Sequence, residues 1–279
     1  MYNYKNKNIG IIGLGVTGRS AINFFSNYSR KIIGWDDSKT IRSNIVKGNI
    51  EILDLNIVKN LKLIDLLFIS PGIKPNHKII KLAKINNINI VGDIDIFWQK
   101  EEKNKNRFIF VTGSNGKSTV TSLIHHLLIS AKINSIIGGN IGVPVLSLNS
   151  KKKPNIYVIE ASSFQLDSAK KIKPNISVLT NISPDHIDWH GNYKNYIKAK
   201  ENLFLNQDES DLAIINIDSE ECFKLYKRIN KRLIKPKIIK ISLNKKLRNT
   251  IYVDGEKVYD NINNKNIFIG RIRDLSSLL

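Results

Sequence analysis

The sequence predicts an α/β fold made of two domains, each built on a parallel sheet. Short segments rich in β-branched residues alternate with stretches of helical length, which is the pattern of βαβ units. A glycine-rich turn follows the first strand of each of two such series, at Gly13 and at Gly113. With 279 residues the chain is longer than one hydrophobic core usually supports. We therefore expect a Rossmann-like domain at residues 1–100 and a second α/β domain at residues 101–279.

The first domain is expected to begin with one βαβ unit. An apolar run at Ile9–Ile12 predicts its first strand, the stretch Arg19–Tyr28 its helix, and the apolar run Lys31–Trp35 its second strand. Further strands are expected at Leu66–Ser70 and Ile88–Val91. These segments predict a parallel sheet.

The second domain is expected to start after a linker. The stretch Lys100–Arg107 is charged, rich in Asn and without apolar periodicity, which is typical of a linker. The pattern then restarts with a strand at Phe108–Thr112 and a long helix at Lys117–Ser130. Later strands are predicted at Ile156–Glu160, Ser177–Thr180, Leu212–Asn216 and Ile238–Ser242, with a hairpin at Asp254-Gly255.

Composition excludes several classes of function. The formal charge is +20, but the lysines are scattered and accompany an excess of Asn and Ile, which indicates compositional bias more than a nucleic-acid site. No apolar run reaches the roughly 18 residues of a membrane span. Cys222 is the single cysteine, so an intramolecular disulfide is impossible and a cysteine-based zinc site is effectively excluded. We expect a cytoplasmic protein that binds neither nucleic acid nor membrane.

The strongest motif is Thr112–Thr119, with the sequence Thr-Gly-Ser-Asn-Gly-Lys-Ser-Thr, between a predicted strand and a predicted helix. Backbone amides at such a turn and the positive end of the helix dipole attract phosphate, a lysine adds a full charge, and a hydroxyl can bind Mg²⁺. The loop is shorter than the common G-x-x-x-x-G-K-[ST] pattern. It predicts ATP or GTP binding without deciding between kinase, ATPase and ligase. The expected nucleotide-binding residues are Gly113, Ser114, Asn115, Gly116, Lys117, Ser118 and Thr119.

The first domain carries a dinucleotide-type fingerprint. Gly13-Leu14-Gly15-Val16-Thr17-Gly18 follows a predicted strand, and Asp36 ends the next strand at the distance expected of a ribose-binding acid. Taken alone, this pattern favours a nicotinamide or flavin cofactor. An ATP loop in the second domain does not belong to a simple dehydrogenase, so a Rossmann-type NAD(P)-binding oxidoreductase is kept as an alternative.

Four motifs together resemble the Mur ligase and folylpolyglutamate synthetase superfamily. They are the shortened loop Thr112–Thr119, Gly138-Gly139-Asn140-Ile141-Gly142, the run Glu160-Ala161-Ser162-Ser163-Phe164-Gln165, and the run from Asn181 to Asp188. The sequences of the second and third motifs are most similar to those of the D-glutamate-adding branch. The resemblance implies a two-domain portion of an ATP-dependent, amide-bond-forming enzyme of peptidoglycan precursor synthesis.

The resemblance also implies a two-metal catalytic site. Its catalytic residues would be Lys117, Glu160, His186 and Lys200, and its Mg²⁺ ligands would be Ser118, Glu160, His186 and Lys200. Lys200, not Lys198, matches the family's carbamylated lysine, and a carbamate can ligate Mg²⁺ where an ammonium would repel it. Carbamylation requires a neutral amine, so the pKa of Lys200 must be depressed. The implied cofactors are ATP, two Mg²⁺ ions and the carbamylated lysine.

The implied substrates are ATP, UDP-N-acetylmuramoyl-L-alanine and D-glutamate, bound by a monomer. The substrate-binding residues carried over by position are Val16, Thr17, Asp36, Gly72, Asn140, Ser162 and His186. Where the family often has Thr-Arg after the acid, this chain has Asp37-Ser38. The family's third, amino-acid-binding domain is expected to be absent, which makes this an incomplete form. A sibling ligase adding another amino acid and a non-catalytic nucleotide-binding remnant are further alternatives.

Overall fold

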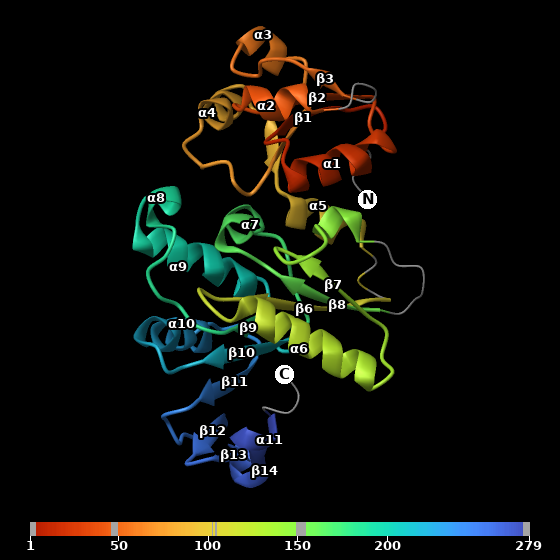
Figure 1. Ribbon diagram of the computed structural model, residues 1–279. Helices are drawn as coiled ribbons and strands as arrows, with labels where there is room; N and C mark the ends of the chain where they lie inside the picture. Colours follow the sequence, from red (N-terminus) through yellow and green to blue (C-terminus); the bar gives the residue numbers. More distant parts are fainter. Residues whose placement is uncertain (1–3, 46–49, 102, 104, 149–154, 276–279) are drawn as a thin grey trace.

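The computed structural model describes residues 4–45, 50–101, 103, 105–148 and 155–275 (Figure 1). Within these residues the strands form two sheets, one from β1 to β5 and one from β6 to β14. The expected α/β fold class is confirmed. Among the described helices, none is long and apolar enough to cross a lipid bilayer.

The first sheet is parallel, with the strand order β3-β2-β1-β4-β5. α1 begins at Val16, earlier than the expected Arg19, because it starts directly at the glycine turn. It ends at Ser26 because the amides of Tyr28 and Ser29 both turn back to the carbonyl of Phe25. The elements are β1 (Asn8–Ile12), α1 (Val16–Ser26), β2 (Lys31–Trp35), α2 (Lys39–Ser43), β3 (Glu51–Ile52), α3 (Val58–Leu61), β4 (Leu66–Ile69), α4 (Lys78–Ile85) and β5 (Asn89–Val91).

The second sheet has the order β14-β13-β12-β11-β10-β9-β6-β8-β7. It is parallel from β7 to β12 and antiparallel beyond, where the expected turn at Asp254-Gly255 joins β12 to β13. The antiparallel edge was not predicted as part of this sheet. Its strands are β6 (Arg107–Thr112), β7 (Ser135–Gly139), β8 (Ile156–Glu160), β9 (Ile176–Leu179), β10 (Leu212–Asn216), β11 (Lys237–Ser242), β12 (Thr250–Asp254), β13 (Lys257–Asp260) and β14 (Ile267–Arg271).

Helices and short 3-10 turns connect these strands (Figure 1). The long α6 lies along the sheet next to β6, β7 and β8. The α-helices are α6 (Lys117–Ser130), α7 (Ser163–Ser168), α8 (Ile187–His190), α9 (Tyr193–Glu201), α10 (Glu220–Asn230) and α11 (Ile272–Leu275). The 3-10 turns are η1 (Val145–Ser147), η2 (Asn202–Phe204) and η3 (Ile262–Asn264).

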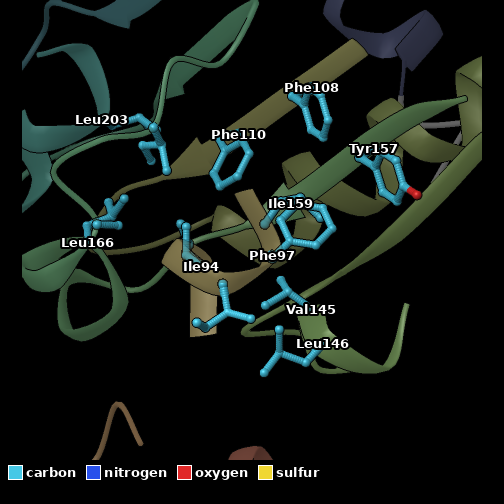
Figure 2. Close-up of a cluster of buried hydrophobic side chains, with 14 of the residues drawn as sticks. Ile94, Phe97, Phe108, Phe110, Val145, Leu146, Tyr157, Ile159, Leu166 and Leu203 are labelled. Atoms are coloured by element: carbon cyan, nitrogen blue, oxygen red, sulfur yellow. The ribbon is translucent and has the colours of Figure 1, made fainter. Parts of the chain in front are cut away.

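One further helix, α5 (Asp93–Lys100), follows the last strand of the first sheet but packs against the second. Its Phe97 contacts Tyr157 of β8 edge-on, with ring centroids 5.3 Å apart, and Tyr157 stacks on Phe108 at 5.4 Å. Figure 2 shows these rings beside Val145 and Leu146 of η1. The resulting buried cluster continues into the first sheet, so the two sheets share one hydrophobic cluster, and each has a further cluster of its own.

Candidate active site

Two glycines shape the loop between β6 and α6. Gly116 has a φ of +75°, in the left-handed region that glycine adopts without steric cost. A Cβ at Gly113 would lie 1.8 Å from Oγ1 of Thr180, so a larger residue does not fit there. α6 begins at Lys117 without a side-chain cap. The amides of its first turn are therefore available to an anion.

The segment after β9 holds this loop in place. Oδ1 of Asn181 accepts a hydrogen bond from the amide of Asn115 at 2.9 Å, and Oγ1 of Thr180 donates to the carbonyl of Asn115 at 2.7 Å. The amide of Ser183 donates to Oγ of Ser114 at 2.9 Å. Ser114 is buried, whereas Asn115, Ser118 and Thr119 are exposed. The loop is thus fixed by protein contacts on one side and open to solvent on the other.

Two lysines donate to carbonyls of the loop. Nζ of Lys117 lies 2.8 Å from the carbonyl oxygen of Ser114, and Nζ of Lys200 lies 2.7 Å from that of Gly113. Lys200 is 1% exposed and its Nζ lies 4.6 Å from the ring centroid of Tyr196. Burial, and after it the nearby charge of Lys117, lowers the pKa of Lys200 to about 7. Lys198, by contrast, is exposed.

Glu160 ends β8 next to the loop strand, in register with Val111 of β6. It is 1% exposed, and its Oε1 accepts a hydrogen bond from Nδ2 of Asn140 at 2.7 Å. Among the described residues its Oε2 is buried and has no hydrogen-bond partner. Gly139 allows this approach, because its φ is +112° and a Cβ there would lie 2.2 Å from the carbonyl oxygen of Glu160. An orphaned carboxylate oxygen at this position is suited to a hard cation.

His186 lies at the start of α8 with a φ of +50°. Its ring packs on Phe164 with centroids 4.7 Å apart, and its Nε2 is 3.4 Å from Oδ2 of Asp185. Asp188 pairs with Lys74 instead, at 3.2 Å. His186 therefore lies next to Phe164. Among the described residues no hydrogen bond joins it to Glu160 or Lys200.

A cavity of about 650 Å³ opens between the two sheets, and we call it the inter-sheet cleft. The first sheet contributes the turn after β1 and the segment after β4, while the second contributes the loop after β7 and the start of α7. Five of the residues carried over as substrate-binding line it, namely Val16, Thr17, Asp36, Gly72 and Asn140. The other two, Ser162 and His186, do not line it, although Phe164 and Gln165 near Ser162 do.

Asp36 has a structural task within this cleft. Its Oδ2 accepts from the amide of Leu14 at 2.8 Å and its Oδ1 from the amide of Ser38 at 2.9 Å. The carboxylate therefore fastens the glycine turn to the end of β2. Close by, the guanidinium of Arg42 lies 4.2 Å from the ring centroid of Trp35, an arrangement that the sequence did not predict.

Three polar side chains around the site were not predicted from the sequence. Gln165 bonds Ser162 and Asp93, Tyr196 bonds Ser114 at 2.7 Å, and Nε2 of His190 is 3.0 Å from Oγ of Ser163. Burial lowers the pKa of His190 to about 4, so the ring is neutral at physiological pH. Gln165 belonged to a motif that was recognised, whereas the others gave no signal because their partners are distant in sequence.

The fold and the site define a two-sheet α/β protein with a short glycine-rich loop between β6 and α6. Residues 111–270 match the Mur ligase middle domain, and residues 7–92 match the Mur ligase MurD-like, N-terminal domain. The chain belongs to the Mur ligase family.

Named relatives agree with this family. The chain is 39% identical over 263 residues to UDP-N-acetylmuramoylalanine--D-glutamate ligase of Rickettsia prowazekii, covering 92% of this chain and 57% of that protein. It is 43% identical over 222 residues to the ligase of the same name from Wolbachia pipientis wMel, covering 78% and 42%. The matched part of the chain thus spans 57% and 42% of the lengths of these two relatives.

Solved structures share the fold at low sequence identity. A UDP-N-acetylmuramate:L-alanyl-gamma-D-glutamyl-meso-diaminopimelate ligase from Neisseria meningitides superposes with a TM-score of 0.57 at 16% identity, covering 92% of this chain and 85% of that one. A murein peptide ligase from Psychrobacter arcticus gives 0.53 at 16% identity, covering 93% and 59%. At this identity the likeness concerns the fold alone.

Proposed function

We propose that this chain provides the nucleotide-binding and UDP-sugar-binding parts of an enzyme that joins D-glutamate to UDP-N-acetylmuramoyl-L-alanine at the expense of ATP. The observation that carries the proposal is the buried amine of Lys200, which reaches from α9 to the phosphate loop and lies 2.7 Å from the carbonyl oxygen of Gly113. Lysines on phosphate loops are common, but a second, buried one with a depressed pKa is suited to modification. The names of the relatives supply the substrates.

The proposed reaction transfers the γ-phosphoryl of ATP to the carboxylate of the L-alanyl group, and the amine of D-glutamate then displaces phosphate from the acyl phosphate. The first turn of α6 would bind the phosphates through its amides, and Lys117 would neutralise charge at the β- and γ-phosphates. Asn140, held by Glu160, lines the inter-sheet cleft and would orient the alanyl end. Such catalysis depends on positioning and on charge neutralisation.

Mg²⁺ bound near the loop would neutralise charge on phosphate oxygens. The orphaned Oε2 of Glu160 fits this role, and Ser118 at the start of α6 and His186 are the further ligands we propose. The described residues contain no group of three or more His, Cys, Asp or Glu side chains suited to a metal. Nucleotide oxygens would therefore complete the coordination.

Lys200 would join the metal ligands after carbamylation. Its neutral amine attacks CO₂, a nitrogen–carbon bond forms as one C–O π bond opens, and one of the two protons on the bonded nitrogen passes to solvent. The product is an anion, which removes the repulsion between an ammonium and a cation. The contact with Gly113 would hold the modified side chain beside the loop.

We also propose a division of labour between the sheets. Residues 1–100 would hold the uridine diphosphate, using Val16, Thr17, Asp36 and Gly72, and residues 101–279 would hold ATP. Ser162 would act on the substrate through Gln165, since Gln165 lines the cleft. We place the reaction in the cytoplasm and expect the protein to act as a monomer.

Calorimetric titration of the purified chain tests the proposal. ATP with Mg²⁺ and UDP-N-acetylmuramoyl-L-alanine should each bind and raise the melting temperature, and NADH should do neither. Lys117→Ala should abolish ATP binding while leaving UDP-sugar binding intact, because the two ligands would use different sheets. Stabilisation by NADH in place of the UDP-sugar would contradict the proposal and favour an oxidoreductase.

A further inference from the structure

Asp93 is a buried carboxylate in the first turn of α5, directly after the first sheet. Its side chain is 2% exposed. Oδ2 accepts a hydrogen bond from Nε2 of Gln165 at 2.7 Å, and Oδ1 accepts from the amide of Ile94 at 2.8 Å. Both donors are neutral, and burying a carboxylate against neutral donors is unfavourable. Packing alone does not account for an acid here.

Gln165 is fixed in one orientation by this carboxylate. Its side chain is 4% exposed, and its Oε1 accepts from the amide and the hydroxyl of Ser162 at 3.0 and 3.1 Å. Turning the amide over would set its NH₂ group against the Ser162 donors and its oxygen against the carboxylate of Asp93. The hydrogen bonds at its two ends therefore define which atom of Gln165 faces which neighbour.

The oriented amide lies between two cavities. Gln165 lines both the inter-sheet cleft and a second cavity of about 380 Å³ that also contains Asp93. Ser162, its partner, closely follows Glu160 in the chain. Asp93 does not line the inter-sheet cleft itself, but it can influence the cleft through its hydrogen bond to Gln165. Nε2 of Gln165 donates one hydrogen to Asp93 and carries a second.

We propose that Asp93 is a positioning residue for substrate binding: its carboxylate holds the Gln165 amide so that the second N–H of Nε2 is presented to an acceptor oxygen of the UDP-sugar in the inter-sheet cleft. The identity of that substrate rests on the proposed function. An asparagine cannot replace the acid, because one of its two ends is an NH₂ group that would face either Gln165 or the amide of Ile94.

The test compares Asp93→Asn with Asp95→Asn, a matched control on the same helix. Asp95 is also a largely buried acid, but its Oδ2 accepts from the amide of Gly92 at 3.2 Å and does not contact Gln165. Calorimetry should show UDP-N-acetylmuramoyl-L-alanine binding about tenfold weaker in Asp93→Asn and unchanged in Asp95→Asn. The affinity for ATP should be the same in both variants and in the wild type.

A double-mutant cycle separates positioning from general structural damage. In a Gln165→Met background, where the amide is already gone, Asp93→Asn should cause no further loss of UDP-sugar affinity. An equal loss in both backgrounds would overturn the proposal, as would a parallel loss of ATP binding. If wild type binds the UDP-sugar and Asp93→Asn binds it equally well, the inference alone fails. If the wild type does not bind the UDP-sugar, both the proposed function and this inference are contradicted.

Discussion

At the scale of single residues, the site depends on two cations that share one loop. Lys117 and Lys200 donate to the neighbouring carbonyls of Ser114 and Gly113, and the charge of Lys117 disfavours charge on Lys200. Because Lys200 is also desolvated, it is the one that gives up its proton. In the proposed function, the loop would therefore keep one cation for phosphate and one nucleophilic amine.

Lys200 should take up CO₂ where Lys198 does not. With a pKa of about 7, the Lys200 amine is mostly protonated at pH 6 and mostly neutral at pH 8, so carbamate should increase with pH across this range. Mass spectrometry after chemical trapping of the carbamate should locate the added carboxyl group on Lys200. Lys200→Ala should lose it and Lys198→Ala, an exposed neighbour on α9, should retain it. Trapping on Lys198, or none in wild type, would contradict the assignment.

Asp93 should make stability depend on pH. Burial raises its pKa in the folded protein to about 6, above the ordinary value of 3.8. The folded state therefore binds more protons than the unfolded chain between about pH 4 and pH 6, and this contribution to the free energy of unfolding is lost as the pH rises. Asp93→Asn removes the contribution. Its melting temperature relative to wild type should increase from pH 4 to pH 6, and a difference that does not vary with pH would refute the shift.

At the scale of elements, the sequence predicted what local pattern determines. The strand–loop–helix geometry at residues 107–130 was predicted because Gly113 and Lys117 occupy fixed positions between a strand and a helix. α5 was missed because it is short and its apolar residues face a sheet far away in sequence. The orientation of Gln165 could not be predicted, since it depends on Asp93 reaching it across the fold. Features set by the local sequence pattern could be predicted. Features that depend on a contact with a distant part of the chain could not.

The loop after β7 should tolerate alanine at one glycine and not at another. Gly139 has a φ of +112° and its Cβ would meet the backbone of Glu160, whereas Gly142 has a φ of +60° and open space around it. Gly139→Ala should lower the free energy of unfolding by about 3 kcal/mol or more. Gly142→Ala should lower it by about 1 kcal/mol. Urea unfolding measures both, and equal losses would show that the close approach to Glu160 does not matter.

At the scale of the whole molecule, the two sheets are joined by shared packing. Phe97 of α5 lies in the same buried cluster as Phe25 under the first sheet and Phe108 in the second. Neither sheet can lose its side of this shared cluster without exposing apolar surface of the other. This distinguishes the molecule from two modules joined by a free tether.

The shared core predicts a single unfolding transition. Differential scanning calorimetry should give one peak whose calorimetric and van't Hoff enthalpies agree, because both sheets unfold together. Phe97→Ala should remove about 3 to 5 kcal/mol of stability and separate the transition into two. Leu127→Ala, at a half-exposed position on α6, is the matched control and should change little. Two peaks in the wild type would contradict the prediction.

The exposed edge strand β14 should affect the solubility of the protein. Among the residues that the structure describes, it is the last strand of its sheet, and Ile267, Phe268 and Ile269 are each more than half exposed along it. A row of apolar side chains beside unpaired main-chain groups can recruit a strand from a neighbouring molecule. Concentrated samples should therefore tend to aggregate through pairing at β14, and Phe268→Lys should reduce this aggregation.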